Sequence, residues 1–290
     1  MKYQSNNSLN SLIILLIILV SCVKDLKTEI QIIPKLCFNC ILNPDSVIKG
    51  SLSLSQSISE TNTLQKVNDA TIELKKDGYV LGIMKNSGKG IYRFESKPTP
   101  GCVYEVKISK SGYSSLYAST LIPHTPIVQY QKDNKELHNA GASSYYTFRS
   151  IYSINDQYGT NRYWKYNKRL TNGIWRFNGG YYGIDSPIFD DFNKVTDATD
   201  KYGFHYEYYL RINDTGLDGK MLTFSEDGID GAVAFFLDAD EHYDKYLKSS
   251  IKQMMNDGGN LLFNEPVQIY SNIENGLGIF GSAAITSFKL

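Results

Sequence analysis

The sequence of 290 residues predicts a mainly β fold, and two observations indicate it. Short runs of alternating apolar and polar residues occupy 28–126, which is the period-two pattern of strands with one buried face. Turn-forming residues interrupt these runs about every 8 to 12 positions, a spacing typical of immunoglobulin-like sandwiches. The composition, 42% apolar and 13% aromatic, is that of a globular chain with a core. We therefore expect an N-terminal immunoglobulin-like sandwich followed by a β-rich domain with one amphipathic helix.

The strands of the first domain follow from this alternation. Ala70, Ile72 and Leu74 point to one face of a strand while Thr71 and Glu73 point to the other. Residues 91–94 and 104–108 repeat the pattern. Gly, Pro and Asp adopt turn conformations at low cost, and four segments of this kind separate the strands: Lys76-Asp77-Gly78, Ser87-Gly88-Lys89-Gly90, Pro98-Thr99-Pro100-Gly101 and Lys110-Ser111-Gly112.

A polar stretch at 127–144 introduces the second domain. We place the boundary near Val128, so that the two domains span 22–127 and 128–290. Aromatic residues are frequent beyond it and suit the half-buried surface of strands. One segment near 240–256 instead has the three-and-four spacing of an amphipathic helix, with acids at its start and glycines after its end. Its apolar positions include Tyr243, Tyr246, Leu247, Ile251, Met254 and Met255.

The N-terminus carries a secretion signal. Nine apolar residues, Leu12–Val20, follow Lys2 and a polar stretch, whereas a helix needs about 20 apolar residues to span a bilayer. We therefore expect residues 1–21 to be a signal peptide that is removed. The tetrapeptide Leu19-Val20-Ser21-Cys22 resembles the bacterial lipobox, which implies acylation of Cys22 as the first residue of the mature chain. The other interpretation is an ordinary secretory signal.

Two longer resemblances concern the mature chain. The segments 68–74, 90–92, 101–106 and 112–113 resemble transthyretin-like or carboxypeptidase-regulatory-like modules, which implies a fold rather than a function. The segment 265–281, taken with the lipobox, Asn43-Pro44-Asp45-Ser46 and the expected helix, resembles the Bacteroidota lipoprotein family known as domain of unknown function 4249. This second resemblance covers essentially the whole mature chain.

The second resemblance implies a location and a partner. Members of that family often lie beside TonB-dependent outer-membrane transporters. The resemblance therefore implies an outer-membrane lipoprotein, anchored through Cys22, that acts as a non-enzymatic ligand-binding or accessory partner of such a transporter. The absence of Asp directly after Cys22 resembles cargo released to the outer membrane, and the periplasmic or surface face stays open. The alternative is a structural or adhesive cell-envelope protein that binds surface polymers.

Charge and motif content exclude several function classes. The chain has 30 basic and 30 acidic residues, so it lacks the positive charge that phosphate-backbone binding requires, and nucleic acid is not an expected partner. The nucleophile motif G-x-S-x-G and the zinc motif H-E-x-x-H are both absent from the sequence. We therefore expect no enzyme, no catalytic residue and no cofactor.

A glycine motif near the C-terminus requires a separate interpretation. Gly276-Leu277-Gly278-Ile279-Phe280-Gly281 fits the G-x-G-x-x-G pattern of dinucleotide-binding turns. Only nine residues follow it, too few for the crossover helix, second strand and acidic residue that such a site needs. We expect a glycine-rich turn before a last strand, with Phe280 in the core.

The cysteines and a group of acids are candidate metal ligands. On a strand over 35–42, Cys37 and Cys40 would point to opposite faces, which disfavours a shared metal. Two interpretations stay open: structural thiols, or one disulfide between Cys102 and either Cys37 or Cys40. The acids Asp238, Asp240, Glu241 and Asp244 offer oxygens of the kind that calcium binds. The dipole of the helix already explains acids at its start, so we expect no metal.

Aromatic residues supply the candidate binding site. The chain has 22 Tyr and 13 Phe, and tyrosine recurs at recognition surfaces because it offers a large contact area at low entropic cost. Tyr181 and Tyr182 lie between glycines, which would expose their rings on a loop. We take Tyr181, Tyr182, Trp164 and Trp175 as candidate ligand-binding residues. The other interpretation is that these rings pack the sandwich.

Overall fold

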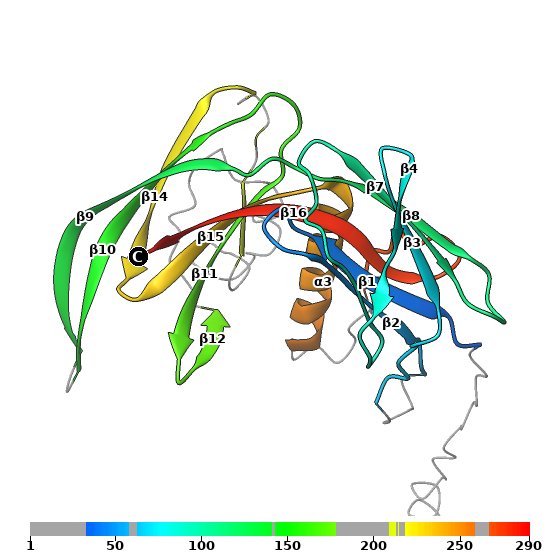
Figure 1. The fold of residues 1–290 in the computed structure, drawn as a ribbon. Helices are drawn as coiled ribbons and strands as arrows, with labels where there is room; N and C mark the ends of the chain where they lie inside the picture. Colours follow the sequence, from blue (N-terminus) through cyan, green and yellow to red (C-terminus); the bar gives the residue numbers. More distant parts are fainter. Residues whose placement is uncertain are drawn as a thin grey trace, which may run out of the picture. The chain divides into compact units, whose positions relative to one another are not determined.

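Strands form most of the structure, as the sequence predicts (Figure 1). The computed structural model describes residues 33–57, 63–140, 143–177, 209–212, 214, 218–258 and 267–290. Residues Pro34–Leu290 form one unit. The elements are β1 (Leu36–Leu42), β2 (Ile48–Leu54), β3 (Thr71–Lys76), β4 (Tyr79–Ile83), β5 (Lys85–Asn86), β6 (Ile91–Phe94), β7 (Val103–Ser109), β8 (Leu116–Leu121), β9 (Ile127–Ala140), β10 (Ser143–Asn155), β11 (Tyr163–Thr171), β12 (Ile174–Phe177), β13 (Tyr209–Ile212), β14 (Met221–Ile229), β15 (Ala232–Ala239), α3 (Glu241–Gly258) and β16 (Leu277–Lys289).

The strands form three sheets. A long sheet has the order β12-β11-β15-β16-β1-β2-β6-β5, with β13 paired to β11. A four-stranded sheet has the order β4-β3-β7-β8, and a three-stranded sheet has the order β14-β10-β9. Each small sheet covers part of the long one, because the buried side chains of the two sheets form a common core. The described part of the chain is therefore two sandwiches that share a sheet.

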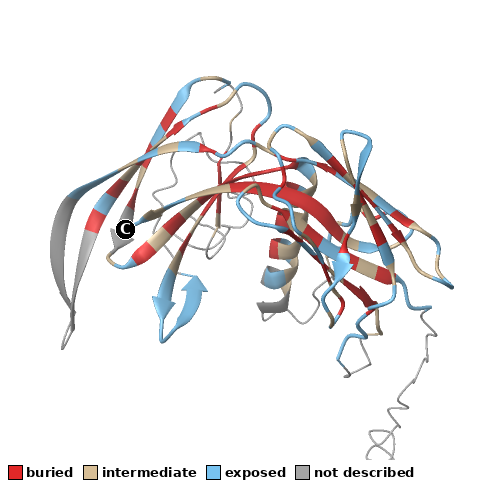
Figure 2. Ribbon diagram, viewed as in Figure 1, coloured by how far each residue is buried: buried red, intermediate tan, exposed pale blue. Residues whose placement is uncertain are grey.

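The last strand, β16, pairs with both halves of the chain. Its first residues pair in parallel with β1, from Cys37↔Leu277 to Leu42↔Ser282. Its later residues pair antiparallel with β15, from Ala239↔Ala283 to Val233↔Lys289. The middle of the strand is buried (Figure 2). The expected boundary near Val128 falls at the start of β9, and the division into two domains stays a prediction.

The first core lies between β1 and β2 on one side and β3, β7 and β8 on the other. Alternate residues of β1 are buried, and Phe38 is among them. Ile72 and Leu74 of β3 are fully buried on the facing sheet, which confirms the predicted face of that strand. Full burial of such side chains contributes about 1.5–3 kcal/mol each.

The predicted turns also form. Asp77 and Gly78 both have positive φ values, 49° and 82°, and connect β3 to β4. Two residues with positive φ are the requirement of the type I′ turn, whose twist matches that of the flanking strands. Asp77 Oδ1 also accepts a 2.8 Å hydrogen bond from the Val103 backbone N–H, which fixes the turn to β7.

The cysteines lie on or near β1 as free thiols. Cys40 is buried and Cys37 is half-buried, so the two point to opposite faces as predicted. Cys102, before β7, is also free, so the structure favours the thiol interpretation over a disulfide. Burial raises the pKa of the Cys40 thiol to about 12, which keeps this thiol protonated and unreactive.

The second core and the helix lie on opposite faces of β15 and β16. Phe288 packs against the second sandwich core, whereas Ala283 packs against α3. Since side chains alternate along a strand, even-numbered residues of β16 face the sandwich cores and odd-numbered residues face the helix. Leu247 and Ile251 are the buried apolar residues in the described part of the helix. The helix, Glu241–Gly258, lies close to the predicted 240–256. Among the described residues, no helix is both long and apolar enough to cross a membrane.

The glycine motif at the start of β16 allows close backbone packing. Gly278 has a φ of +110°, and a Cβ there would lie 2.0 Å from the carbonyl oxygen of Phe38 on β1. A Cβ at Gly281 would lie 3.0 Å from the Cβ of Tyr243 on α3. Phe280 between them is fully buried, which confirms the predicted core residue. The predicted turn before the strand is wrong for most of the motif, because residues from Leu277 onward already pair within β16. These glycines therefore serve strand pairing and helix packing.

Gly278→Ala tests this interpretation. We expect it to lower the free energy of unfolding by more than about 4 kcal/mol, because the new Cβ overlaps backbone and the φ is unfavourable for alanine. Gly112→Ala is the matched control, since its φ is +82° and nothing lies within 4 Å of its Cβ position. The free energy of unfolding of the control should fall by only about 1–2 kcal/mol. Equal losses in denaturant titrations of the two variants would contradict a role in close packing.

Candidate functional site

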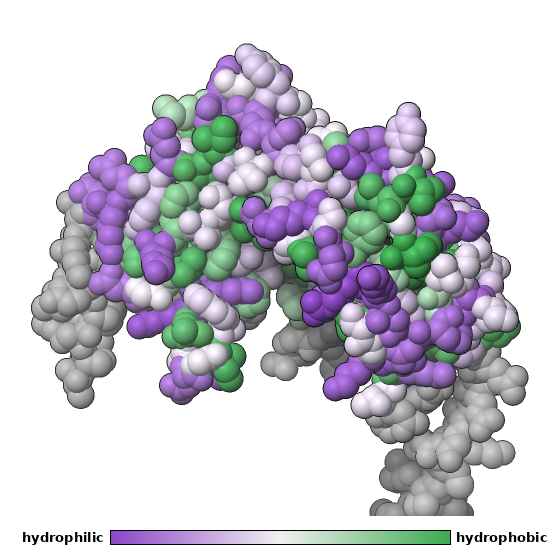
Figure 3. All heavy atoms as spheres, viewed as in Figure 1, coloured by the Kyte–Doolittle hydropathy of each residue, from purple (hydrophilic) through white to green (hydrophobic). Residues whose placement is uncertain are grey.

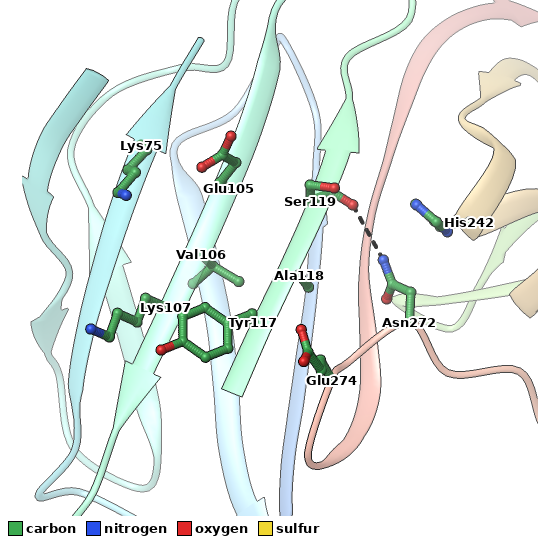
Figure 4. Close-up of a pocket in the computed structure, with 10 residues that line it drawn as sticks. All are labelled: Lys75, Glu105, Val106, Lys107, Tyr117, Ala118, Ser119, His242, Asn272 and Glu274. Carbon is green, nitrogen blue, oxygen red and sulfur yellow. Dashed lines mark hydrogen bonds between the residues drawn. The ribbon is translucent and has the colours of Figure 1, made fainter. Parts of the chain in front are cut away.

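A groove lies where the outer face of the four-stranded sheet meets the start of α3 and the segment before β16 (Figure 4). Its volume is about 410 Å³. A second cavity of about 660 Å³ shares Ser119 and His242 with it, so the two are adjacent. The groove is lined by Lys75, Glu105, Val106, Lys107, Tyr117, Ala118, Ser119, His242, Asn272 and Glu274.

Strand register brings the charged residues of the groove into rows. Lys75 pairs with Glu105, which pairs with Ser119. In the next row Lys107 pairs with Tyr117, and its Nζ lies 5.8 Å from the centre of that ring. Cross-strand neighbours of opposite charge stabilise a sheet and leave its outer face hydrated. The floor of the groove therefore presents alternating charges beside an aromatic ring.

Asn272 fixes the wall of the groove. Its Nδ2 donates hydrogen bonds to the carbonyl oxygens of Ser119, at 3.3 Å, and Phe280, at 2.8 Å. Its Oδ1 accepts a 2.9 Å hydrogen bond from the Phe280 N–H. The side chain thus connects the segment before β16 to both β8 and β16. No local pattern predicts this role, because Ser119 is distant from Asn272 in the chain.

His242 lies at the end of the groove, in the first turn of α3. Its Nδ1 is 2.7 Å from the hydroxyl oxygen of Tyr270, and the two rings are stacked with centroids 6.1 Å apart. Lys245 lies over the ring of Tyr270, with its Nζ 5.7 Å from the ring centre. His242 is thus held by an aromatic partner that the sequence did not predict.

The carboxylate of Asp240 joins three elements behind the groove. Its Oδ2 accepts hydrogen bonds from Thr120 Oγ1 of β8, at 2.9 Å, and from the His242 N–H, at 3.2 Å. Its Oδ1 accepts hydrogen bonds from the N–H groups of Tyr243 and Ser282, each at 2.9 Å. Asp240 is therefore the N-cap of α3, and it also connects that helix to β8 and β16.

The other predicted acids have separate structural partners. Asp244 accepts hydrogen bonds from Trp164 Nε1, at 2.8 Å, and Arg211 Nε, at 2.7 Å. Glu241 forms an exposed ion pair with Lys245. The four acids thus point to different partners. Among the described residues, no group of three or more His, Cys, Asp or Glu side chains has the arrangement of a metal site.

Asp238 lines the second cavity and is buried. Its Oδ1 accepts a 2.8 Å hydrogen bond from the Arg162 N–H, and its Oδ2 accepts one of 2.8 Å from Asn161 Nδ2. Burial outweighs these bonds and raises the pKa of Asp238 to about 6. Its protonation therefore changes near neutral pH.

The structure separates the predicted aromatic site residues. Trp164 is fully buried between the long sheet and α3, which corrects its prediction as a ligand-binding residue: the ring packs beneath the helix, and its N–H is bonded to Asp244. Trp175 on β12 is 52% exposed and is cross-strand to Leu170. Tyr181, Tyr182 and Cys22 lie outside the described residues.

Comparison with known families identifies the family of this chain. The family model described as domain of unknown function (DUF4249) matches residues 23–289. The chain belongs to this family. The matched part of this DUF4249 protein includes both sandwiches, the helix and the groove. No curated protein matches the chain.

Asp238→Asn tests the electrostatics of the second cavity. Because the folded-state pKa of Asp238 lies above its ordinary value of 3.8, the folded state binds more protons between these values, and this group's contribution to stability falls as the pH rises from about 4 through about 6. In the wild type, this contribution to the free energy of unfolding should fall by on the order of 3 kcal/mol between pH 4 and pH 7. The variant has no carboxyl group at this position and should lack that pH-dependent fall.

Denaturant titrations across that pH range measure the effect. The difference in unfolding free energy between the wild type and Asp238→Asn should decrease as the pH rises. Asp45→Asn changes an exposed carboxyl on the turn before β2 and is the matched control. A wild-type-minus-variant difference that is constant from pH 4 to pH 7 would show that Asp238 does not titrate there.

Proposed function

We propose that this DUF4249 protein is a Bacteroidota outer-membrane lipoprotein that acts as a non-enzymatic partner of a TonB-dependent transporter, capturing or positioning a ligand. Acyl chains on Cys22 would anchor it, and the first sandwich would be a transthyretin-like module. The lipobox-like sequence before Cys22 supports the anchor. The family match supports it further, since it begins at residue 23, directly after that cysteine.

The observation that carries the proposal is the outer face of the four-stranded sheet. Large apolar residues are exposed there around the alternating charges of the groove, and Figure 3 shows apolar residues over this sheet among polar ones. Exposed apolar surface of this kind marks interaction sites, and a mixture of apolar and charged groups is usual in non-obligate interfaces. The apolar residues of this face are Val80, Ile83, Val103, Tyr117 and Leu121.

The groups beside the groove support binding rather than catalysis. The buried carboxylates of Asp238, Asp240 and Asp244 accept hydrogen bonds from backbone, amide, hydroxyl, indole or guanidinium donors. His242 is bonded to Tyr270. These side chains maintain the architecture around the groove. The groove itself offers charge and an aromatic ring, which suits recognition of a polar ligand or of a loop from a partner.

Affinity purification after gentle detergent extraction tests the proposal. A tagged wild-type chain should recover a large β-barrel transporter. Tyr117→Ser with Leu121→Ser should reduce that recovery by at least about 10-fold, since central aromatic and apolar contacts dominate binding energy. Met221→Ser with Leu64→Ser, which changes exposed apolar residues away from this face, is the matched control.

The outcomes distinguish the parts of the proposal. Repeated recovery of the wild type without a barrel, or with surface polymer instead, would contradict the transporter partnership. Equal recovery with both double variants would contradict the role of this face. Cys22→Ala should leave the protein unacylated and outside the membrane fraction, and unchanged fractionation would contradict the anchor.

A further inference from the structure

Three polar side chains lie together in the apolar core of the second sandwich. Lys165 and Asn167 are two residues apart on β11, so they point to the same face of the strand. Glu226 lies on β14, in the sheet that covers this face. Lys165 is 0% exposed, Asn167 2% and Glu226 3%. Groups of this kind are rarely buried so completely, which makes their arrangement informative.

The three side chains are in mutual contact. Lys165 Nζ is 2.5 Å from Glu226 Oε1 and 2.9 Å from Asn167 Oδ1. Asn167 Nδ2 is 3.3 Å from the same oxygen of Glu226. An amine, the carbonyl oxygen of a primary amide and a carboxyl oxygen therefore meet at one point, and the carbon that the amine would attack is the one that carries this carbonyl oxygen.

The surroundings disfavour the charged form of the amine. Tyr152 and Phe236 enclose the amine, with ring centres 5.0 Å and 5.8 Å from Lys165 Nζ. Burial lowers the pKa of Lys165, although the charge of Glu226 opposes this effect. Tyr152 donates a 2.8 Å hydrogen bond to Glu226 Oε1, while Glu226 Oε2 is buried with no hydrogen-bond partner among the described residues. An ion pair with an unsatisfied oxygen is costly in a core.

We propose that Lys165 and Asn167 form an intramolecular amide bond, with Glu226 as the proton carrier. Proton transfer within the Lys165–Glu226 pair gives a neutral amine and a carboxylic acid. The amine nitrogen attacks Cγ of Asn167, and a bond forms between Lys165 Nζ and that carbon. The Cγ–Nδ2 bond breaks, and Nδ2 leaves as ammonia.

The protons and atoms of this step balance. Glu226, protonated by the first transfer, gives its proton to the leaving Nδ2 and then takes one proton from the nitrogen that has attacked, so its carboxyl group is regenerated. The net reaction is the primary amide of Asn167 plus the amine of Lys165 giving a secondary amide plus ammonia. No oxidant, reductant or other reactant is needed. A desolvated lysine is an established type of nucleophile, and the bond would replace a buried ion pair with a neutral group. This inference is independent of the proposed transporter partnership.

Tryptic digestion of the unfolded wild-type protein, followed by mass spectrometry, tests the bond. Arg162 and Lys168 flank the site, and trypsin does not cleave after a lysine whose amine is acylated. We expect one uncleaved peptide, Tyr163–Lys168, lighter than its sequence mass by about 17 Da, the mass of one ammonia. Cleavage after Lys165, giving two peptides of unaltered mass, would overturn the proposal.

Two variants test the role of Glu226. Glu226→Gln retains the size of the side chain but cannot carry the proton, so the peptide should be cleaved after Lys165 and have its full mass. Tyr152→Phe removes one hydrogen bond to Glu226 and leaves all three reacting groups, so it should retain the bond. Circular dichroism and tryptophan fluorescence report whether each variant folds. If a folded Glu226→Gln protein contains the bond, the assignment of Glu226 is wrong. If that variant does not fold, the wild-type digest alone decides whether the bond exists.

Discussion

The candidate site depends on the hydrogen bonds that the buried carboxylate of Asp240 accepts. Its two oxygens accept hydrogen bonds from a side-chain hydroxyl of β8, from the first turn of α3 and from the backbone of β16. A charged acceptor with several donors gives hydrogen bonds of the strong type. The groove lies between these elements, so the same carboxylate that caps the helix also sets the position of its walls.

The last strand, β16, connects the two sandwiches of the described fold. Because β16 pairs with β1 and β15, it belongs to both sandwiches. Gly278 lets it approach β1, and Gly281 lets α3 approach it. The sheet that carries the proposed binding face packs on this long sheet, and Lys165 of the buried network lies in the long sheet itself. The two proposals are nevertheless separable, since one concerns an exposed face and the other an enclosed network.

Local sequence patterns predict the strands and the helix. The candidate site is instead positioned by contacts between residues that are far apart in the sequence. The alternation around Ile72, the helix over 240–256 and the last strand with Phe280 were all visible in the sequence, because side-chain period and turn chemistry are local. The hydrogen bond between Asp240 and Thr120 cannot be predicted from the sequence, since 120 residues separate them. The prediction of Trp164 as a ligand-binding residue is wrong because nothing local shows which face of β11 meets α3. No local pattern predicts the burial of Lys165, because a lysine in an alternating strand normally faces solvent.

Hydrogen exchange in Asp240→Ala measures the central claim most directly. If one carboxylate connects the three elements, the variant should lose amide protection together in β8, in the first turns of α3 and in β16 near Ser282. Glu241→Ala is the control, since it removes only an exposed ion pair beside the same helix start and should leave β8 and β16 protected. Loss of protection confined to the first turn of α3 in Asp240→Ala would show a simple helix cap and would contradict the account.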